Sequence, residues 1–197
     1  MLNFKTISRI FLDFLNNPSI ILKSEDRLSH LIRLNMETNQ KLWDLEDSAR
    51  MVELGPEHVA AVKQEIDKNN QIRNDLIREI DTEITNQIQL VPLKSQEQFY
   101  SESPGMIIDR LAILYIKLSV IRDLSSLIKE ADLLEEYRVK ENIILSQVNL
   151  LSNFLDSYFD KLKRKKVFFE IQQPVKIYND KRVEEYIKFL KQNRKDP

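Results

Sequence analysis

Two consecutive stretches of the chain hold acidic, amide and arginine side chains at a density that ordinary surface patterning does not require. They read LWDLEDSAR, from Leu42 to Arg50, and VKQEIDKNNQIRNDLIREID, from Val62 to Asp81. Carboxylates are oxygen ligands for Mg²⁺, arginines bind phosphate, and amides offer both donors and acceptors to hydroxyl groups. The pattern therefore indicates either a site for a phosphorylated or hydroxylated ligand or a network of ion pairs.

The candidate ligand-binding residues come from both stretches, from an amide upstream of them and from a charged pair downstream. They are Asn35, Glu46, Asp47, Arg50, Asp67, Asn70, Arg73, Asn74, Asp81, Asp109 and Arg110. These residue types do not by themselves assign a catalytic residue or a cofactor, so the sequence leaves open whether the protein is an enzyme. We assign no metal site.

One interpretation is a Mg²⁺-dependent enzyme whose carboxylates converge from neighbouring antiparallel helices, with arginines stabilising the charge of a phosphate. The stretches loosely resemble the all-α nucleotide pyrophosphohydrolases, whose signature is EExxE on one helix and ExxD on the next. After Glu46 and Asp47, however, Arg50 replaces the third acid, and the second motif begins at Asp67 and ends on the amide of Asn70. The missing carboxylates weaken metal binding and count against this interpretation.

A second interpretation is structural, with the charges pairing among themselves. Glu46 and Arg50 stand four residues apart in the order that favours an ion pair on a helix. Arg73 falls in the middle of an apolar stripe, where a buried guanidinium must be paired with an acid. Such a network fixes the register of the helices without doing chemistry. It leaves the surplus of amides, including Asn70 and Asn74, without an explanation.

A third interpretation accounts for the amides. A groove between the second and third predicted helices binds a sugar nucleotide or a sugar phosphate, with amides on the hydroxyl groups and arginine on the phosphate. We favour this hypothesis, although the residue types do not fix the identity of the ligand.

The composition excludes several other classes of function. The chain carries 30 basic and 31 acidic residues and a net charge of −1, so nothing global favours a nucleic-acid partner. The absence of cysteine excludes disulfides, a thiol nucleophile and a thiolate metal site, and it favours a cytoplasmic protein. His30 and His58 are isolated in the sequence, which argues against a zinc site.

Neither a transmembrane segment nor a signal peptide is expected. The longest apolar run, Leu111–Ile116, is far shorter than the roughly 20 residues that cross a bilayer. Lys5, Arg9 and Asp13 interrupt any apolar region near the N-terminus.

With only two glycines and six prolines, the chain favours long helices. We expect helices over residues 3–15, 24–51, 56–89, 104–129 and 132–166, an extended segment over 167–177 and a short helix over 182–190. The fold class is an all-α antiparallel bundle of about four long helices with a short N-terminal helix and an extended C-terminal arm. Residues 1–23 form the N-terminal helix and connector, 24–166 the bundle, and 167–197 the arm and last helix.

The helix that begins at Pro104 is predicted to be the most buried. From Ile107 to Ile121 it is apolar almost all round, so its whole surface must be covered. The other helices of the chain or a second copy can cover it, and we favour a homodimer.

The same residues resemble a bacterial family, domain of unknown function 4254. The resemblance rests on LWDLEDSAR, VKQEIDKNNQIRNDLIREID, SPGMIIDRLAILYIK and VKIYND in this order, and it spans roughly residues 28 to 180. It implies a helical protein, often encoded near glycosyltransferases and genes for envelope polysaccharides, and it supplies no activity. It also implies site roles for Asp75, Asn179 and Asp180 besides the candidates above.

Overall fold

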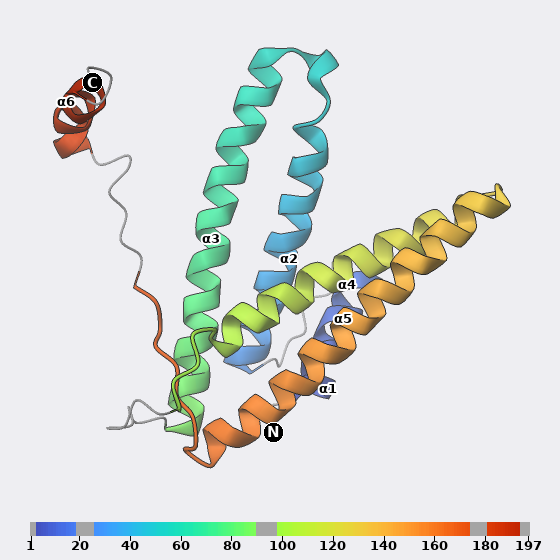
Figure 1. The fold of residues 1–197 in the computed structure, drawn as a ribbon, viewed down its shortest axis with the longest axis vertical. Coiled ribbons are helices and arrows are strands. Elements are labelled where there is room, and N and C mark those ends of the chain that lie inside the picture. Colours follow the sequence, from blue (N-terminus) through green and yellow to red (C-terminus); the bar gives the residue numbers. More distant parts are fainter. Residues whose placement is uncertain (1–2, 19–25, 90–97, 174–180, 194–197) are drawn as a thin grey trace.

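The computed structural model describes residues 3–18, 26–89, 98–173 and 181–193, and regular structure there is helical apart from one isolated bridge (Figure 1). The predicted all-α class is confirmed. The helices are α1 (Phe4–Asn16), α2 (Arg27–Ser48), α3 (Pro56–Ile88), α4 (Pro104–Leu127), α5 (Ala131–Lys163) and α6 (Glu184–Asn193), with 3-10 turns η1 (Val52–Leu54) and η3 (Lys181–Val183). None of the helices in the described ranges is long and apolar enough to span a membrane.

The bundle consists of two antiparallel helical hairpins, α2–α3 and α4–α5. The helices of each hairpin pack along one another, and α4 contacts both α2 and α3 where the hairpins meet. Figure 1 shows the far ends of the two hairpins pointing away from each other, with α1 beside their junction. The two hairpins therefore share one core at their junction, and polar side chains that lie there come from three different helices.

The starts of the helices follow the sequence signals. Asp26 caps α2 by accepting a hydrogen bond from the backbone N–H of Ser29, and Ser103 caps α4 through Met106 in the same way. The break predicted between residues 129 and 132 is present, and α5 begins at Ala131. Glu130 occupies the N-cap position, but its side chain makes no capping hydrogen bond to the helix, and Asp132 lies in the first turn, where a negative charge suits the helix dipole.

The core is centred on α4, which has the most buried residues of the described helices. Ile107, Ile108 and Leu111 are completely buried, which confirms the prediction from the apolar run. The N-terminal helix docks on this core with Ile7 and Phe11.

The start of the C-terminal arm is extended and held against the bundle. Phe168 forms an isolated parallel bridge with Phe99, and its carbonyl accepts a hydrogen bond from the backbone N–H of Tyr100 at 3.0 Å. Val167 and Phe169 on either side are buried in the core. This attachment brings residues 171–173 beside the junction of α3 and α4.

Candidate functional site

A buried polar cluster lies where α2, α3 and α4 meet. One carboxylate oxygen of Asp109, Oδ1, accepts hydrogen bonds from the amide nitrogens of Asn35 at 2.9 Å and Asn39 at 2.8 Å. All three side chains are buried. Because an unbonded carboxylate or amide in this position would be costly, these bonds explain why polar residues interrupt the apolar stripes of α2 and α4.

The arrangement follows from helix geometry. Asn35 and Asn39 are four residues apart and lie on one face of α2, which packs against α4. Asn39 also donates to the backbone carbonyl of Asn35 at 3.0 Å and to its side-chain Oδ1 at 3.2 Å, so both amides are held in place.

Arg73 reaches the same carboxylate from α3. Its Nε lies 3.9 Å from Asp109 Oδ1, an ion-pair distance without a hydrogen bond. The sequence interpretation required an acid for a buried Arg73, and Asp109 is that acid. Asn35, Arg73 and Asp109, three of the candidate residues, are thus brought together.

A second polar centre joins α3 to the start of α4. The buried side chain of Asp81 accepts a hydrogen bond from the backbone N–H of Gly105 at 2.7 Å, and Ser103 also bonds to it. A side chain at position 105 would not fit, because its Cβ would lie 2.6 Å from the Ile77 carbonyl and 2.8 Å from Asp81 Oδ1. The glycine is therefore required for the close approach of the two helices.

Burial of Asp81 raises the pKa of its carboxyl from 3.8 to about 6. The hydrogen bonds from Ser103 and Gly105 favour the charged form and partly oppose this shift. The N-terminus of α4 also favours a negative charge at this position.

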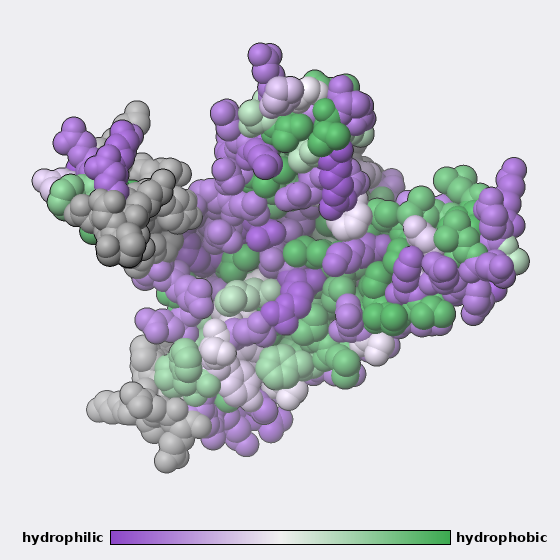
Figure 2. Space-filling view, turned by 45° about the horizontal axis from the view of Figure 1, so that its top comes forward, coloured by the Kyte–Doolittle hydropathy of each residue, from purple (hydrophilic) through white to green (hydrophobic). Residues whose placement is uncertain are grey.

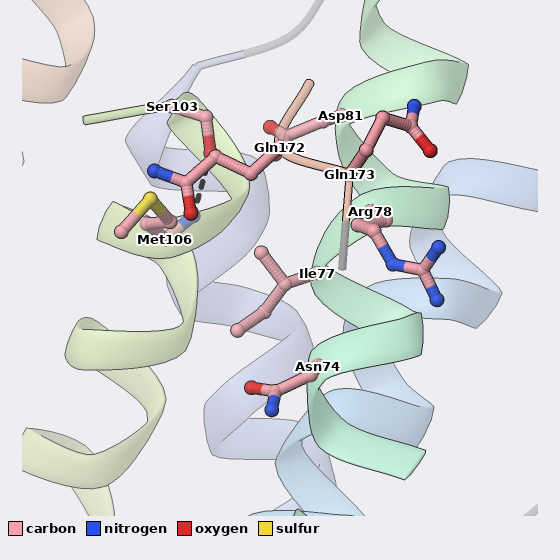
Figure 3. Close-up of a pocket in the computed structure, with 8 residues that line it drawn as sticks. All are labelled: Asn74, Ile77, Arg78, Asp81, Ser103, Met106, Gln172 and Gln173. Atoms are coloured by element: carbon pink, nitrogen blue, oxygen red, sulfur yellow. Dashed lines mark hydrogen bonds between the residues drawn. The ribbon is translucent and has the colours of Figure 1, made fainter. Parts of the chain in front are cut away.

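A pocket of about 270 Å³ opens beside Asp81 (Figure 3). Figure 3 shows α3 on one side of it, the first turn of α4 on the other, and the segment that carries Gln172 and Gln173 running past both. It is lined by Asn74, Ile77, Arg78, Asp81, Ser103, Met106, Gln172 and Gln173. Two of the candidate residues, Asn74 and Asp81, lie on its wall.

The acidic candidates at the far part of the α2–α3 hairpin do not join either centre. Glu46, Asp47 and Asp67 are all exposed, and in the described part of the chain no hydrogen bond or ion pair links Glu46 or Asp47 with Asp67. Arg50 bonds to Asp47 at 2.8 Å instead of the predicted Glu46. The reason is that α2 ends at Ser48, so Arg50 lies beyond the helical spacing on which that pairing depends.

The remaining candidates lie at different places. Arg110 is exposed and pairs with Glu102, and Asn70 is half-buried on α3. Asp75 binds Arg78 at the edge of the pocket. Asn179 and Asp180 lie outside the described residues.

Sequence reasoning missed four polar residues of the pocket: Arg78, Ser103, Gln172 and Gln173. Arg78 had a usable signal, since Asn74, Arg78 and Asp81 follow each other at intervals of four and three residues along one flank of α3. The paired glutamines carry no such signal, because only the attachment of the arm at Phe168 brings them to α3.

No group of three or more acidic or histidine side chains gathers anywhere in the described ranges in a way that could hold a metal ion. The arrangement instead offers amides, a guanidinium and a carboxylate, which hold hydroxyl groups and phosphate through hydrogen bonds.

A family model described as "Protein of unknown function (DUF4254)" matches residues 29–171. The match runs from the first turn of α2 past the end of α5 and therefore includes both polar centres. Comparison with curated proteins and with solved structures gives no match.

Proposed function

The chain belongs to the DUF4254 family, whose description assigns no activity, and from the pocket beside Asp81 we propose that the protein binds a sugar phosphate or a sugar of similar size. The observation that carries the proposal is the convergence of three amides, one guanidinium and one carboxylate on a single pocket. They come from two separate parts of the chain, α3 and residues 172–173, while Ser103 and Met106 at the start of α4 complete the wall of the pocket.

The amides suit the hydroxyl groups of a sugar. Each amide of Asn74, Gln172 and Gln173 has two N–H donors and one carbonyl acceptor, so it can satisfy a hydroxyl in either direction. None of the three has a hydrogen-bond partner within the described residues, so each is free to bind a ligand.

The charged groups suit two different parts of such a ligand. The guanidinium of Arg78 is paired with Asp75 on the same helix, and a phosphate can take the place of that carboxylate in a bidentate contact. Asp81 is an acceptor for a sugar hydroxyl when it is ionised. Its hydrogen bonds to Gly105 and Ser103 fix the position of the carboxyl group.

The volume of the pocket favours a sugar phosphate over the larger sugar nucleotide, the other ligand that the sequence suggests. About 270 Å³ lies just below the roughly 300–1,000 Å³ of most small-molecule sites. The pocket therefore fits one sugar with its phosphate. The nucleoside part of a sugar nucleotide would have to lie outside it.

The cluster around Asp109 has a structural role under this proposal. Its amides and carboxylate bond to one another and so fix the register of α2 against α4. The ligand binds instead in the pocket beside Asp81. The Mg²⁺-dependent alternative needs carboxylates that converge, whereas Glu46 and Asp67 are exposed without a mutual contact. The proposed setting is the cytoplasm, where sugar phosphates for envelope polysaccharides are available.

A thermal-shift screen tests the proposal. The panel contains sugar phosphates, free sugars, sugar nucleotides, nucleoside triphosphates and divalent metal ions, each added to the full chain. A ligand at 100 times its Kd stabilises the folded state by about 2.7 kcal/mol. We expect a sugar phosphate to raise the melting temperature and Gln172→Ala to remove the rise.

Gln64→Ala is the matched control, because Gln64 is an exposed amide of α3 outside the pocket. A shift with Mg²⁺ alone would favour the enzyme interpretation instead. A panel without any shift would leave the charged residues with a structural role only.

A further inference from the structure

The α5 helix carries an exposed apolar stripe that α4 does not cover. Its members are Val139, Ile143, Leu150 and Phe154. At 3.6 residues per turn these four side chains lie within about 60° of one another around the helix. The core residues Val148 and Leu155 lie about 100–120° away from the stripe, whereas buried Tyr158 lies about 40° from its edge and contacts Phe154. Figure 2 shows apolar surface along the α4–α5 hairpin.

The intervals between the four residues of the stripe are the same when they are read from either end of the helix. These intervals are four, seven and four residues, and their midpoint falls between Ser146 and Gln147. When two such helices pair antiparallel about a twofold axis at this midpoint, Val139 faces Phe154 of the second copy and Ile143 faces Leu150. Every member of the stripe then meets another member, and intervals of four and seven residues are those of a coiled-coil seam.

The charged residues at the two ends of the stripe have the same symmetry. Asp132 and Lys161 lie on the same face of α5 as the stripe and at equal distances from its midpoint. Antiparallel pairing brings Asp132 of each copy to Lys161 of the other, whereas parallel pairing would bring like charges together. The charges therefore favour a second copy in the antiparallel direction.

The surface next to Leu150 can receive a side chain from that second copy. Leu150 borders a groove of about 450 Å³ between α4 and α5, which is also lined by Ile113 and Leu114. In the antiparallel pair, Ile143 of the second copy lies at this position. A knob from one helix then enters a hole on the other, as in coiled coils.

We propose that two copies of this chain pair through antiparallel α5 helices, with the twofold axis passing between Ser146 and Gln147. The pairing covers the stripe without using the pocket beside Asp81, so it stands independently of the proposed ligand. The homodimer expected from the sequence would therefore form through α5. The buried α4, whose apolar residues led to that expectation, would not be the helix that pairs.

Sedimentation equilibrium of the full chain tests the pairing. We expect the weight-average mass to rise with concentration from 23.4 kDa towards twice that value. Leu150→Glu places two charges in the middle of the seam and should keep the protein at the mass of one chain. Val52→Glu is the matched control, since Val52 is 71% exposed against 70% for Leu150 but lies at the tip of the α2–α3 hairpin. The mass of a single chain at every concentration, or loss of the dimer in both variants, would overturn the proposal.

Disulfide crosslinking tests the direction of the pairing, because the chain has no cysteine of its own. Ser146→Cys should crosslink to itself across the twofold axis under oxidation. Val139→Cys should not, because the two copies of residue 139 lie about 22 Å apart along antiparallel helices, far beyond the roughly 7 Å that a disulfide allows between Cα atoms. Efficient crosslinking through residue 139, or none through residue 146, would contradict the antiparallel seam. Circular-dichroism melting confirms that each variant is folded.

Discussion

The carboxylate of Asp81 on α3 accepts a hydrogen bond from the backbone N–H of Gly105 in the first turn of α4, at 2.7 Å. This bond joins the two helical hairpins beside the proposed pocket. It also satisfies an N–H group that no residue of α4 itself can satisfy, since the first N–H groups of a helix have no partner within it. The contact therefore links the stability of the fold to the geometry of the site.

Replacing Gly105 with alanine should destabilise the protein. The added methyl group would lie 2.6 Å from the backbone carbonyl of Ile77, so α3 and α4 would have to move apart. Overpacking of this kind typically costs about 1–3 kcal/mol. The free energy of unfolding in urea measures the cost, and a value equal to that of the wild type would show that the helices do not approach so closely.

Asp81→Asn should change how stability depends on pH. The raised pKa means that the folded state binds the proton more tightly than the unfolded state, so the stabilisation is fully present below pH 3.8 and is lost as the pH rises to about 6. Asparagine keeps an oxygen for Gly105 and does not ionise. Across this pH range the wild type should lose about 3 kcal/mol relative to the variant. Urea unfolding at several pH values gives the difference, and parallel curves for the two proteins would contradict the raised pKa.

The sequence predicted the fold because its signals are local. Ser103 and Pro104 mark the start of α4, Gly55 and Pro56 mark the start of α3, and apolar periodicity marks the faces between. Divergence of the two hairpins was not predictable in this way. It depends on how side chains at the junction pack, and helical periodicity gives a buried face without giving the angle at which another helix crosses it.

The site was predictable only where it depends on one helix or on a charge that must be paired. The position of Arg73 within the apolar stripe of its helix implied an acidic partner, which Asp109 provides for this half-buried side chain. Glu46 and Asp67 are acidic residues like Asp109, but they lie on the exposed sides of their helices. Gln172 reaches the pocket through the contact between Phe99 and Phe168, and the sequence contains no local trace of such a contact.

Asp109→Ala should cost about 2–5 kcal/mol of stability. It would leave the buried amide nitrogen of Asn35 without its acceptor, at about 1–3 kcal/mol for an unsatisfied group, and Arg73 without its charge partner. Asn39 would lose one acceptor and keep its bonds to Asn35. Asp67→Ala is the matched control, because this exposed carboxylate has no partner in the described residues and its loss should change stability by no more than about 0.5 kcal/mol. Equal effects in chemical unfolding would mean that the cluster around Asp109 does not hold the helices together.

Leu114→Ala tests the position of the core. Leu114 is buried in α4, so its truncation should leave a cavity and cost about 2–5 kcal/mol. Leu127→Ala at the exposed end of the same helix should have little effect. A cost below about 1 kcal/mol for Leu114→Ala, determined by chemical denaturation, would contradict the central place of α4.

Calorimetric titration of a sugar phosphate into the wild-type protein and into Asn74→Ala is the most direct test of ligand binding in the pocket. We expect saturable binding at one site per chain, lost in Asn74→Ala and retained in the control Gln64→Ala. Asn74 is exposed on the pocket wall, so its replacement should not affect folding. Binding of equal strength in Asn74→Ala, Gln172→Ala and the wild type, or no binding to the wild type, would contradict the proposed function.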